Sequence, residues 1–266
     1  MKHKRIMEEI TKIFGKNSFT VTGWQNYQHS EVSINKLSKI INDCCISAIP
    51  RPNMMIRKNL IFSVIERDKT YSVWRKEEAL ERIITLINDK AGIYNQFPLN
   101  KNNSKENIDL IKETNSMIKS LIELKFDQGG GTPLFALVEI IKNLILFRKY
   151  FAEDSTVESL LIVAPEFYYN YYSRNSNFTD FMNSIDLLSN KYKTSILFKK
   201  IKITNPSFLD DSLSKLNKSA KIEWKKSSNS RFSKIAKIDA NSIVTYLNKA
   251  ELEALKFDNW ETVMKL

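Results

Sequence analysis

Two apolar runs decide the fold of this chain: Asn107-Ile108-Asp109-Leu110-Ile111 and Ser120-Leu121-Ile122-Glu123-Leu124-Lys125-Phe126. Both are rich in isoleucine and leucine and are short, as buried β-strands are. The polar residues 113–115 between them predict a turn, so we expect the two runs to pair as an antiparallel hairpin. Charged side chains are unusual inside such strands, and each run carries at least one.

The charged residues of these strands form a candidate catalytic group. Side chains alternate between the two faces of a strand, so Glu123 and Lys125 share a face, which we expect to be accessible to solvent. Pairing of the hairpin would bring the carboxylate of Asp109 close to Glu123. Two carboxylates and a lysine at the ends of neighbouring strands can hold a divalent cation and activate a water molecule. A buried or edge ion-pair cluster without catalysis is the alternative interpretation.

The elements around the hairpin predict a mixed sheet with helices on its faces. Apolar residues recur at helical spacing over 74–88 and again over 132–150, where a Thr-Pro pair suits a helix start. Short strands are expected over 93–97 and 159–164. The resulting order, helix–strand–strand–strand–helix–strand, places the chain in the α/β (α+β) class.

The chain divides into a core with two flanking segments. Residues 71–203 form the core, and residues 1–70 form an N-terminal extension of helices and a strand packed on it. Residues 204–266 form a basic C-terminal extension suited to contact with nucleic acid. Outside the central elements, we expect helices over 2–14, 30–45, 178–189, 207–217 and 242–256, and strands over 60–65, 194–203 and 221–225.

The net charge of +11 is concentrated in one part of the chain. Residues 191–237 hold 13 Lys and Arg against 3 Asp and Glu, an excess of ten positive charges. Such a surface attracts phosphates and releases their counterions, which favours a nucleic acid as the partner. A solvated lysine-rich face is the alternative. The residues expected to contact the nucleic-acid backbone are Lys225, Lys226, Arg231 and Lys234.

Several classes of function are disfavoured by what the sequence lacks. Its apolar runs are shorter than a membrane span, and early acidic residues make the N-terminus unlike a signal peptide, so we expect a cytoplasmic protein with no membrane partner. Cys44 and Cys45 are adjacent, which disfavours a disulfide between them, and we expect two buried thiols. With only His3 and His29, a histidine-based hydrolase is not expected.

Asp109, 13 intervening residues and then Glu123-Leu124-Lys125 resemble the core motif of the PD-(D/E)XK nuclease superfamily, the restriction-endonuclease-like proteins. The family's order of elements, helix–strand–strand–strand–helix–strand, also matches residues 74–164, about the middle third of the chain. The motif itself is short and degenerate. The chain departs from it at Asn107-Ile108, where the family often has a proline before the aspartate.

The resemblance implies a restriction-endonuclease-like mixed sheet and a metal-dependent endonuclease. Asp109, Glu123 and the main-chain carbonyl of Leu124 would bind Mg²⁺ or Mn²⁺, which prefer oxygen ligands. Lys125 would orient or deprotonate the attacking water and offset charge at the scissile phosphate. In the family's usual reaction, water attacks phosphorus and a 3′-oxygen leaves.

Three features near the motif each keep two interpretations. Glu77, Glu78 and Glu81 on the preceding helix are candidate outer ligands, as in some relatives, or else a solvated helix face. Residues 129–131, three glycines before a helix, approach a phosphate or serve as a flexible connector. The aromatic residues 167–172 stack on bases or pack in the interior.

The sequence therefore predicts an endonuclease that acts on DNA, such as a bacterial restriction-modification or phage-defence enzyme. We expect the DNA to be double-stranded. The alternative is a non-catalytic nucleic-acid-binding protein that retains a nuclease-like fold as a scaffold. The recognition sequence, the choice between DNA and RNA, and the oligomeric state, a homodimer included, are left open.

Overall fold

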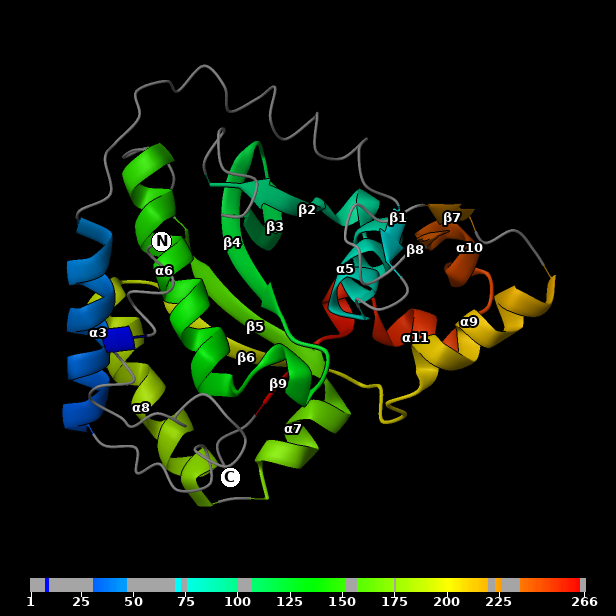
Figure 1. Cartoon of the computed structure of the whole chain (residues 1–266). Coiled ribbons are helices and arrows are strands. Elements are labelled where there is room, and N and C mark those ends of the chain that lie inside the picture. The colour runs from blue at the N-terminus through cyan, green and yellow to red at the C-terminus, as the bar shows by residue number, and fades with distance from the viewer. Residues whose placement is uncertain are drawn as a thin grey trace.

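The computed structural model describes residues 8–9, 31–46, 70–72, 76–99, 107–151, 157–174, 176–219, 223–225 and 235–263. In this part of the chain, six strands form one mixed sheet in the order β2-β3-β4-β5-β6-β9 (Figure 1). These strands are β2 (Ile93–Pro98), β3 (Asn107–Thr114), β4 (Met117–Leu124), β5 (Ser159–Pro165), β6 (Ser195–Ile201) and β9 (Glu261–Thr262). The predicted mixed α/β class is confirmed.

The sheet is antiparallel on one side and parallel in its middle. Strands β2, β3 and β4 pair antiparallel, β4–β5 and β5–β6 pair parallel, and β9 closes the edge antiparallel to β6. The hairpin predicted between β3 and β4 is present, with its turn at Asn115 and Ser116. Both turn residues have positive φ, 52° and 61°, which suits the right-handed twist of a two-residue hairpin. The turn lies slightly later than the sequence predicts.

Helices cover both faces of the sheet (Figure 1). On one face α6 (Pro133–Phe151) and α8 (Ser176–Tyr192) pack on the strands, and α3 (Glu31–Ile46) packs on those two helices. On the other face α5 (Lys76–Ile87) contacts β2 and β3. Helix α7 (Glu166–Tyr172) follows β5 directly and contacts β5 and β6. Two hydrophobic clusters, one on each face of the sheet, result from this layering.

Helix α6 forms for reasons that are visible in the sequence. The Thr132 hydroxyl accepts a hydrogen bond from the backbone N–H of Phe135 at 3.3 Å, which caps the helix N-terminus. Pro133 occupies the first helical position, where its missing N–H costs nothing. Leu134, Leu137 and their apolar neighbours then bury a wide stripe against the sheet.

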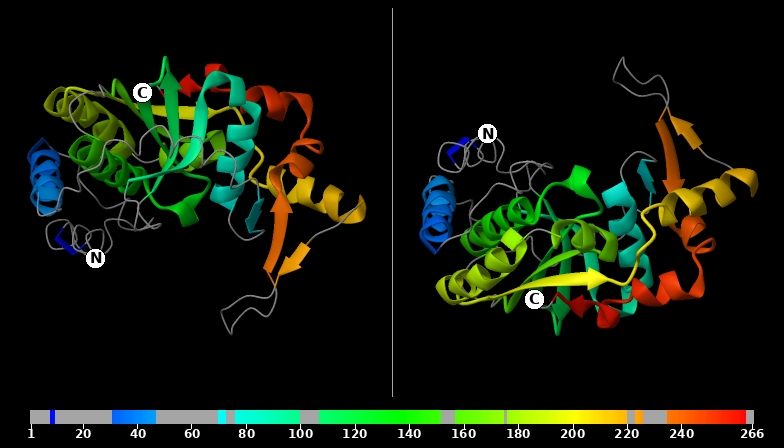
Figure 2. Two further views of the ribbon diagram at one scale, coloured as in Figure 1. Left: turned by 90° about the horizontal axis from the view of Figure 1, so that it is seen from above. Right: turned by 90° about the horizontal axis from the view of Figure 1, so that it is seen from below.

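A smaller sheet lies at the end of the molecule opposite α3 (Figure 2). Its strands β1 (Thr70–Ser72), β8 (Ile235–Asp239) and β7 (Glu223–Lys225) pair in the order β1-β8-β7. Near it α9 (Phe208–Ser219) and α10 (Ala240–Val244) contact each other, and α10 packs on α5. The chain then returns through α11 (Lys249–Ala254) to add β9 to the main sheet. The last described residues thus complete the core sheet.

One predicted helix is wrong. The sequence pattern predicts a single helix over 242–256, but the structure has two, α10 and α11, separated at 245–248. Asn248 starts the second helix, because its side chain accepts from the N–H of Glu251 while the Glu251 carboxylate accepts from the N–H of Asn248. This reciprocal capping box favours a helix start at a position that hydrophobic periodicity does not mark.

The remaining predicted elements fall into two groups. Those over 30–45, 178–189, 194–203, 207–217 and 221–225 are confirmed as α3, α8, β6, α9 and β7, with ends that differ by a few residues. The strand predicted over 60–65 lies outside the described residues, and of the helix over 2–14 only residues 8 and 9, both helical, are described. Both cysteines are buried, as predicted. Within the described residues, each helix is too short or too polar to cross a membrane.

Candidate active site

The ends of β3 and β4 bring Asp109 and Glu123 together. Leu110 pairs with Ile122, and the same register continued by one residue places Asp109 across from Glu123. The Oδ2 atom of Asp109 accepts a hydrogen bond from the backbone N–H of Leu124 at 2.9 Å, which fixes the carboxylate at the end of β4. The predicted proximity of the two carboxylates is therefore confirmed. Leu124 thus contacts Asp109 through its backbone N–H. Its backbone carbonyl stays a predicted metal ligand.

Lys125 lies at the centre of a cluster of acids. Its Nζ donates to Glu123 Oε1 at 2.7 Å and to Glu139 Oε2 at 3.0 Å, and it lies 3.8 Å from Glu77 Oε1. Glu123 and Lys125 share a strand face, as predicted, but that face is not accessible to solvent. The two residues are only 5% and 2% exposed, because α6 covers this face of β4.

The protonation states of this cluster follow from burial and from Lys125. Burial raises the pKa of Glu123 well above its ordinary value, and the neighbouring Asp109 adds to this. Burial alone would lower the pKa of Lys125, but Glu123 and Glu139 outweigh it and hold that pKa well above the ordinary value. Burial alone would likewise raise the pKa of Glu139, but Lys125 and a hydrogen bond with Glu123 keep it lowered. Lys125 therefore stays protonated at neutral pH, and its charge opposes the effect of burial on the carboxyls around it.

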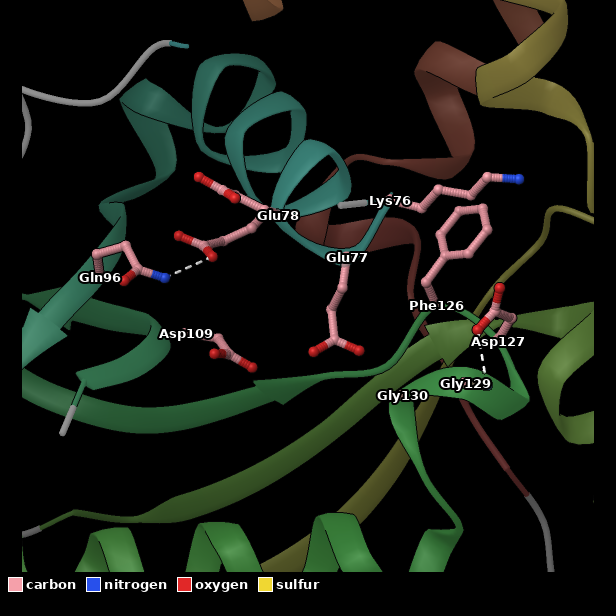
Figure 3. A pocket seen from close by; sticks show the side chains of 10 residues that line it. Lys76, Glu77, Glu78, Gln96, Asp109, Phe126, Asp127, Gly129 and Gly130 are labelled. Atoms are coloured by element: carbon pink, nitrogen blue, oxygen red, sulfur yellow. Dashed lines mark hydrogen bonds between the residues drawn. The ribbon is translucent and has the colours of Figure 1, made fainter. Parts of the chain in front are cut away.

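Glu77 reaches the cluster from the first turn of α5. In Figure 3 its carboxylate and that of Asp109 project into the same cleft. Glu77 Oε2 is buried and has no hydrogen-bond partner. Burial raises the pKa of Glu77 to about 7, against the opposing charge of Lys125. The carboxylate rests over Gly130 of η3 (Gln128–Gly130), where an added Cβ would lie 2.5 Å from Glu77 Oε2. Glycine at this position therefore makes room for the acid.

Glu81 is held in a second polar network on the same helix. It accepts from Gln96 Nε2 at 2.7 Å and pairs with Arg82. Asn107 in turn donates to Gln96 at 2.8 Å, and Gln96 lies across from Asp109 in the β2–β3 register with a positive φ of 50°. Burial raises the pKa of Glu81 well above its ordinary value, against the opposing charge of Arg82.

The interpretation of the α5 acids as a solvated helix face is wrong for Glu81, which is 3% exposed. The Glu77 side chain is 36% exposed, and it is turned toward Lys125, at 3.8 Å. The Glu78 side chain is 24% exposed and lies 3.6 Å from Arg82. All three acids line the cleft, although the sequence places them on the helix face opposite the buried one. Helix α5 therefore buries its apolar side and lines the cleft with its acidic side.

Two connected hollows open above the cluster. The larger, of about 600 Å³, extends from Asp109 along the first turn of α5 to Phe126 and Asp127. The smaller, of about 320 Å³, lies over β4 and α6. Glu77, Gln96, Asp109 and Gly130 line both, so these residues stand where the two meet. The lining of the smaller hollow is almost wholly polar, as a site for an ion or a phosphate would be.

The donor set suits a hard divalent cation, but the side chains are not arranged as ligands. Among the described residues, no three acidic, thiol or imidazole groups stand in positions that would hold a metal ion. The positive charge among these acids is instead the ammonium of Lys125. The unpartnered oxygen of Glu77 and the carboxylate of Asp109 are hard oxygen donors of the kind Mg²⁺ takes. A metal held by Glu123 would require its contact with Lys125 to loosen.

Glu139 is a site residue that the sequence interpretation missed. It lies on α6, in a stretch that is apolar from Leu134 to Phe147 except for Glu139, Lys142 and Asn143. That signal was present in the sequence, because residues spaced by three and four share one face of a helix. Three polar residues on one side of an otherwise apolar helix indicate that this side faces a polar site.

The aromatic residues 167–172 pack in the interior, which decides between the two interpretations. Tyr168, Tyr169 and Tyr172 are buried, and the Tyr168 hydroxyl donates to the carbonyl of Gly131 at 3.0 Å. Base stacking by these three tyrosines is therefore wrong. Of the glycines 129–131, Gly129 and Gly130 belong to the 3-10 helix η3, and both interpretations of this stretch stay predictions.

The predicted nucleic-acid contacts fall mostly beyond the described residues. Lys225 ends strand β7, but its side chain is not described. Lys226, Arg231 and Lys234 lie outside the described residues altogether. Comparison of the chain with protein-family models, with curated proteins and with solved structures gave no match in any of the three.

Proposed function

We propose that this protein is a Mg²⁺-dependent endonuclease that hydrolyses phosphodiester bonds in DNA. The observation that carries the proposal is the convergence of Asp109, Glu123 and Lys125 at the ends of two paired strands, beside an open polar hollow. Asp109 and Glu123 lie on neighbouring strands, and Lys125 contacts Glu123 directly. Two carboxylates and one lysine in this arrangement are the groups that metal-assisted hydrolysis of a phosphodiester requires.

The arrangement of elements supports a restriction-endonuclease-like fold. Helix α5, strands β2, β3 and β4, helix α6 and strand β5 follow one another in the order that the PD-(D/E)XK resemblance implies. The first three strands are antiparallel and the fourth is parallel to β4, as expected when a hairpin precedes a strand–helix–strand unit. The motif residues lie at the end of the central pair, where α5 and α6 both contribute acids.

In this proposal, Asp109 and Glu123 would hold the metal, together with the carbonyl of Leu124. When bound, Mg²⁺ or Mn²⁺ would supply positive charge that stabilises the developing charge on the phosphate and would acidify a water. Lys125, which its raised pKa keeps protonated, would orient that water and offset the charge of the phosphate. The water oxygen would bond to phosphorus as its proton passes to solvent, and the bond to the 3′-oxygen would break, with that oxygen taking up a proton from solvent. Burial raises the pKa of Glu123 and so favours its protonated form, which binds a metal poorly. Metal affinity is therefore expected to rise with pH.

The biological setting that fits this chemistry is a cytoplasmic restriction or phage-defence enzyme that binds double-stranded DNA. The excess of ten positive charges over residues 191–237 supports DNA as the partner. Replacing Lys225, Lys226, Arg231 and Lys234 together by glutamine should lower the slope of log K against log[salt] by about 3 to 4, if each meets one phosphate. An unchanged slope would show that these residues do not contact the DNA.

The decisive experiment is cleavage of a supercoiled plasmid by the purified protein with Mg²⁺ and with EDTA. We expect nicking or linearisation with Mg²⁺ and none with EDTA. Asp109→Asn and Glu123→Gln keep the size of each side chain and should lower the rate by at least roughly a hundredfold. Glu158→Gln is the matched control, since Glu158 is an exposed partner of Lys119 at the start of β5. Full activity in either site variant would refute the assignment.

A second candidate function has an observation in its favour. Lys125 is already neutralised by three acids, and no metal-ligand arrangement is present in the described part of the chain. A non-catalytic nucleic-acid-binding protein that keeps a nuclease-like fold would look like this. Binding of a DNA duplex without cleavage in either Mg²⁺ or Mn²⁺, together with no heat of metal binding in calorimetry, would favour this second function.

A further inference from the structure

One face of α6 presents three polar residues to the smaller hollow. Glu139, Lys142 and Asn143 are spaced by three and four residues, so they lie on the same side of the helix, and all three line the hollow. Glu139 is accounted for by its contact with Lys125. Lys142 and Asn143 take no part in the catalytic cluster, and an apolar helix packed on a sheet has no structural need for them.

Of the three lysines that line the two hollows, only Lys142 is left to bind an anion. Lys125 is held by three acids, and Lys76 pairs with Asp210 of α9 at 2.6 Å. Lys142 makes no ion pair with any acid among the described residues. Burial raises the pKa of Asp109 against the charges of Lys125 and Lys142, and Lys142 also adds to the lowering of the pKa of Glu139 by Lys125. Lys142 therefore stands within electrostatic reach of the cluster.

Asn143 supplies a second and independent sign of a missing partner. Its side chain is 3% exposed, and its Oδ1 atom is buried without a hydrogen bond. Buried amide groups are nearly always satisfied, so an orphan in a polar hollow indicates a ligand or a water. A half-turn of the amide exchanges its oxygen for its NH₂ group, and the same position then donates to an acceptor such as a phosphate oxygen.

We propose that Lys142 and Asn143 form a phosphate subsite beside the catalytic carboxylates, which binds a backbone phosphate next to the scissile one. Lys142 neutralises that phosphate and Asn143 donates a hydrogen bond to it. Lys142 and Asn143 lie one helical turn beyond Glu139 and line only the smaller hollow, whereas Lys76 lines only the larger, so this phosphate would lie in the hollow away from Lys76. That the bound phosphate belongs to DNA rests on the proposed nuclease function.

The test measures binding rather than cleavage. A short fluorescein-labelled DNA duplex is titrated with protein at several salt concentrations, with Ca²⁺ in place of Mg²⁺. Lys142→Gln should weaken binding by roughly three- to tenfold and lower the slope of log K against log[salt] by about 0.9, the value for one phosphate contact. Lys142→Arg should restore the slope. The charge-matched control is Lys90→Gln, an exposed residue of η2 (Asp89–Ala91) at the far end of α5 from Glu77.

Single methylphosphonate linkages, which carry no charge, then locate the contact. A neutral linkage at one particular position should weaken the binding of wild-type protein to the duplex. The same linkage should leave the binding of the Lys142→Gln variant unchanged. If Lys142→Gln matches wild type in affinity and slope, or if Lys90→Gln loses as much, the subsite is wrong. Failure of the nuclease function gives a different result: duplex bound with the Lys142-dependent loss, yet never cleaved in Mg²⁺ or Mn²⁺. That result would retain the subsite and refute the endonuclease.

Discussion

Lys125 shows what one buried charge does to its surroundings. Its ammonium compensates Glu123, Glu139 and Glu77, so Lys125→Met would leave buried acids without their counter-charge. We expect a loss of about 3–5 kcal/mol in the free energy of unfolding at neutral pH, since breaking a buried pair costs this much. The loss should shrink toward pH 5, where the orphaned acids take up protons. Urea unfolding at both pH values measures it.

The control for this change is Lys119→Met. Lys119 also pairs with a glutamate, Glu158, but the acid is mostly exposed, and such pairs contribute less than about 1 kcal/mol. Equal losses in the two variants would mean that the charge of Lys125 is not what holds its cluster together.

Glu77 makes stability depend on pH in the opposite sense to most acids. Its pKa is about 7 in the folded protein against 4.5 as the ordinary value, so the folded state binds the extra proton. This contribution to stability is complete below pH 4.5 and is lost as pH rises to about 7. Glutamine does not ionise, so Glu77→Gln keeps its stability where wild type loses this contribution. The urea midpoint of Glu77→Gln minus that of wild type should therefore rise from pH 5 to pH 8. A difference that stays constant with pH would contradict the raised pKa.

At the scale of elements, the short helix η3 is shaped around the site. A methyl group on Gly130 would lie 2.5 Å from Glu77 Oε2, whereas one on Gly129 would lie 3.0 Å from Asp127 Oδ1. Neither glycine has a positive φ, so alanine brings no backbone strain at these positions. We expect Gly130→Ala to displace the Glu77 carboxylate and weaken Mg²⁺ binding in calorimetry by roughly tenfold, within the range seen when groups supporting a metal site are lost. Gly129→Ala should bind Mg²⁺ as wild type does.

The elements themselves were largely predictable, because they depend on local patterns. The β3–β4 hairpin and helix α6 follow from alternating or recurring apolar residues and from the Thr132 cap, all of which are read within a few positions. The burial of Glu81 was not predictable, because it depends on Gln96 of another strand. Glu139 could have been found from its place in an apolar helix, whereas its contact with Lys125 required the fold. Local sequence thus predicts where elements form, and long-range contacts decide which polar residues are enclosed.

At the scale of the whole molecule, Asn88 ties the C-terminal segment to the helix that carries Glu77. It is buried directly after α5, and its Nδ2 donates to the carbonyls of Ile84 at 2.8 Å and Leu255 at 2.9 Å. Its Oδ1 accepts from the N–H of Phe257, in η4 (Phe257–Asn259), at 2.7 Å. One side chain therefore satisfies backbone groups that lie 167 and 169 residues away from it in sequence.

Asn88→Ala would leave the Leu255 carbonyl and the Phe257 N–H without partners, at about 1–3 kcal/mol for each buried group. We expect a loss of about 2–4 kcal/mol in urea unfolding and faster hydrogen exchange at the Phe257 amide. Asn259→Ala removes a comparable amide, which donates to Glu253 in an exposed position, and should cost about 1 kcal/mol or less. Because β9 follows this tie and completes the main sheet beside β6, loosening the tie should also expose the edge of β6. If the amides of β6 stay as protected as in wild type while Phe257 exchanges freely, then β9 is held in place independently of Asn88.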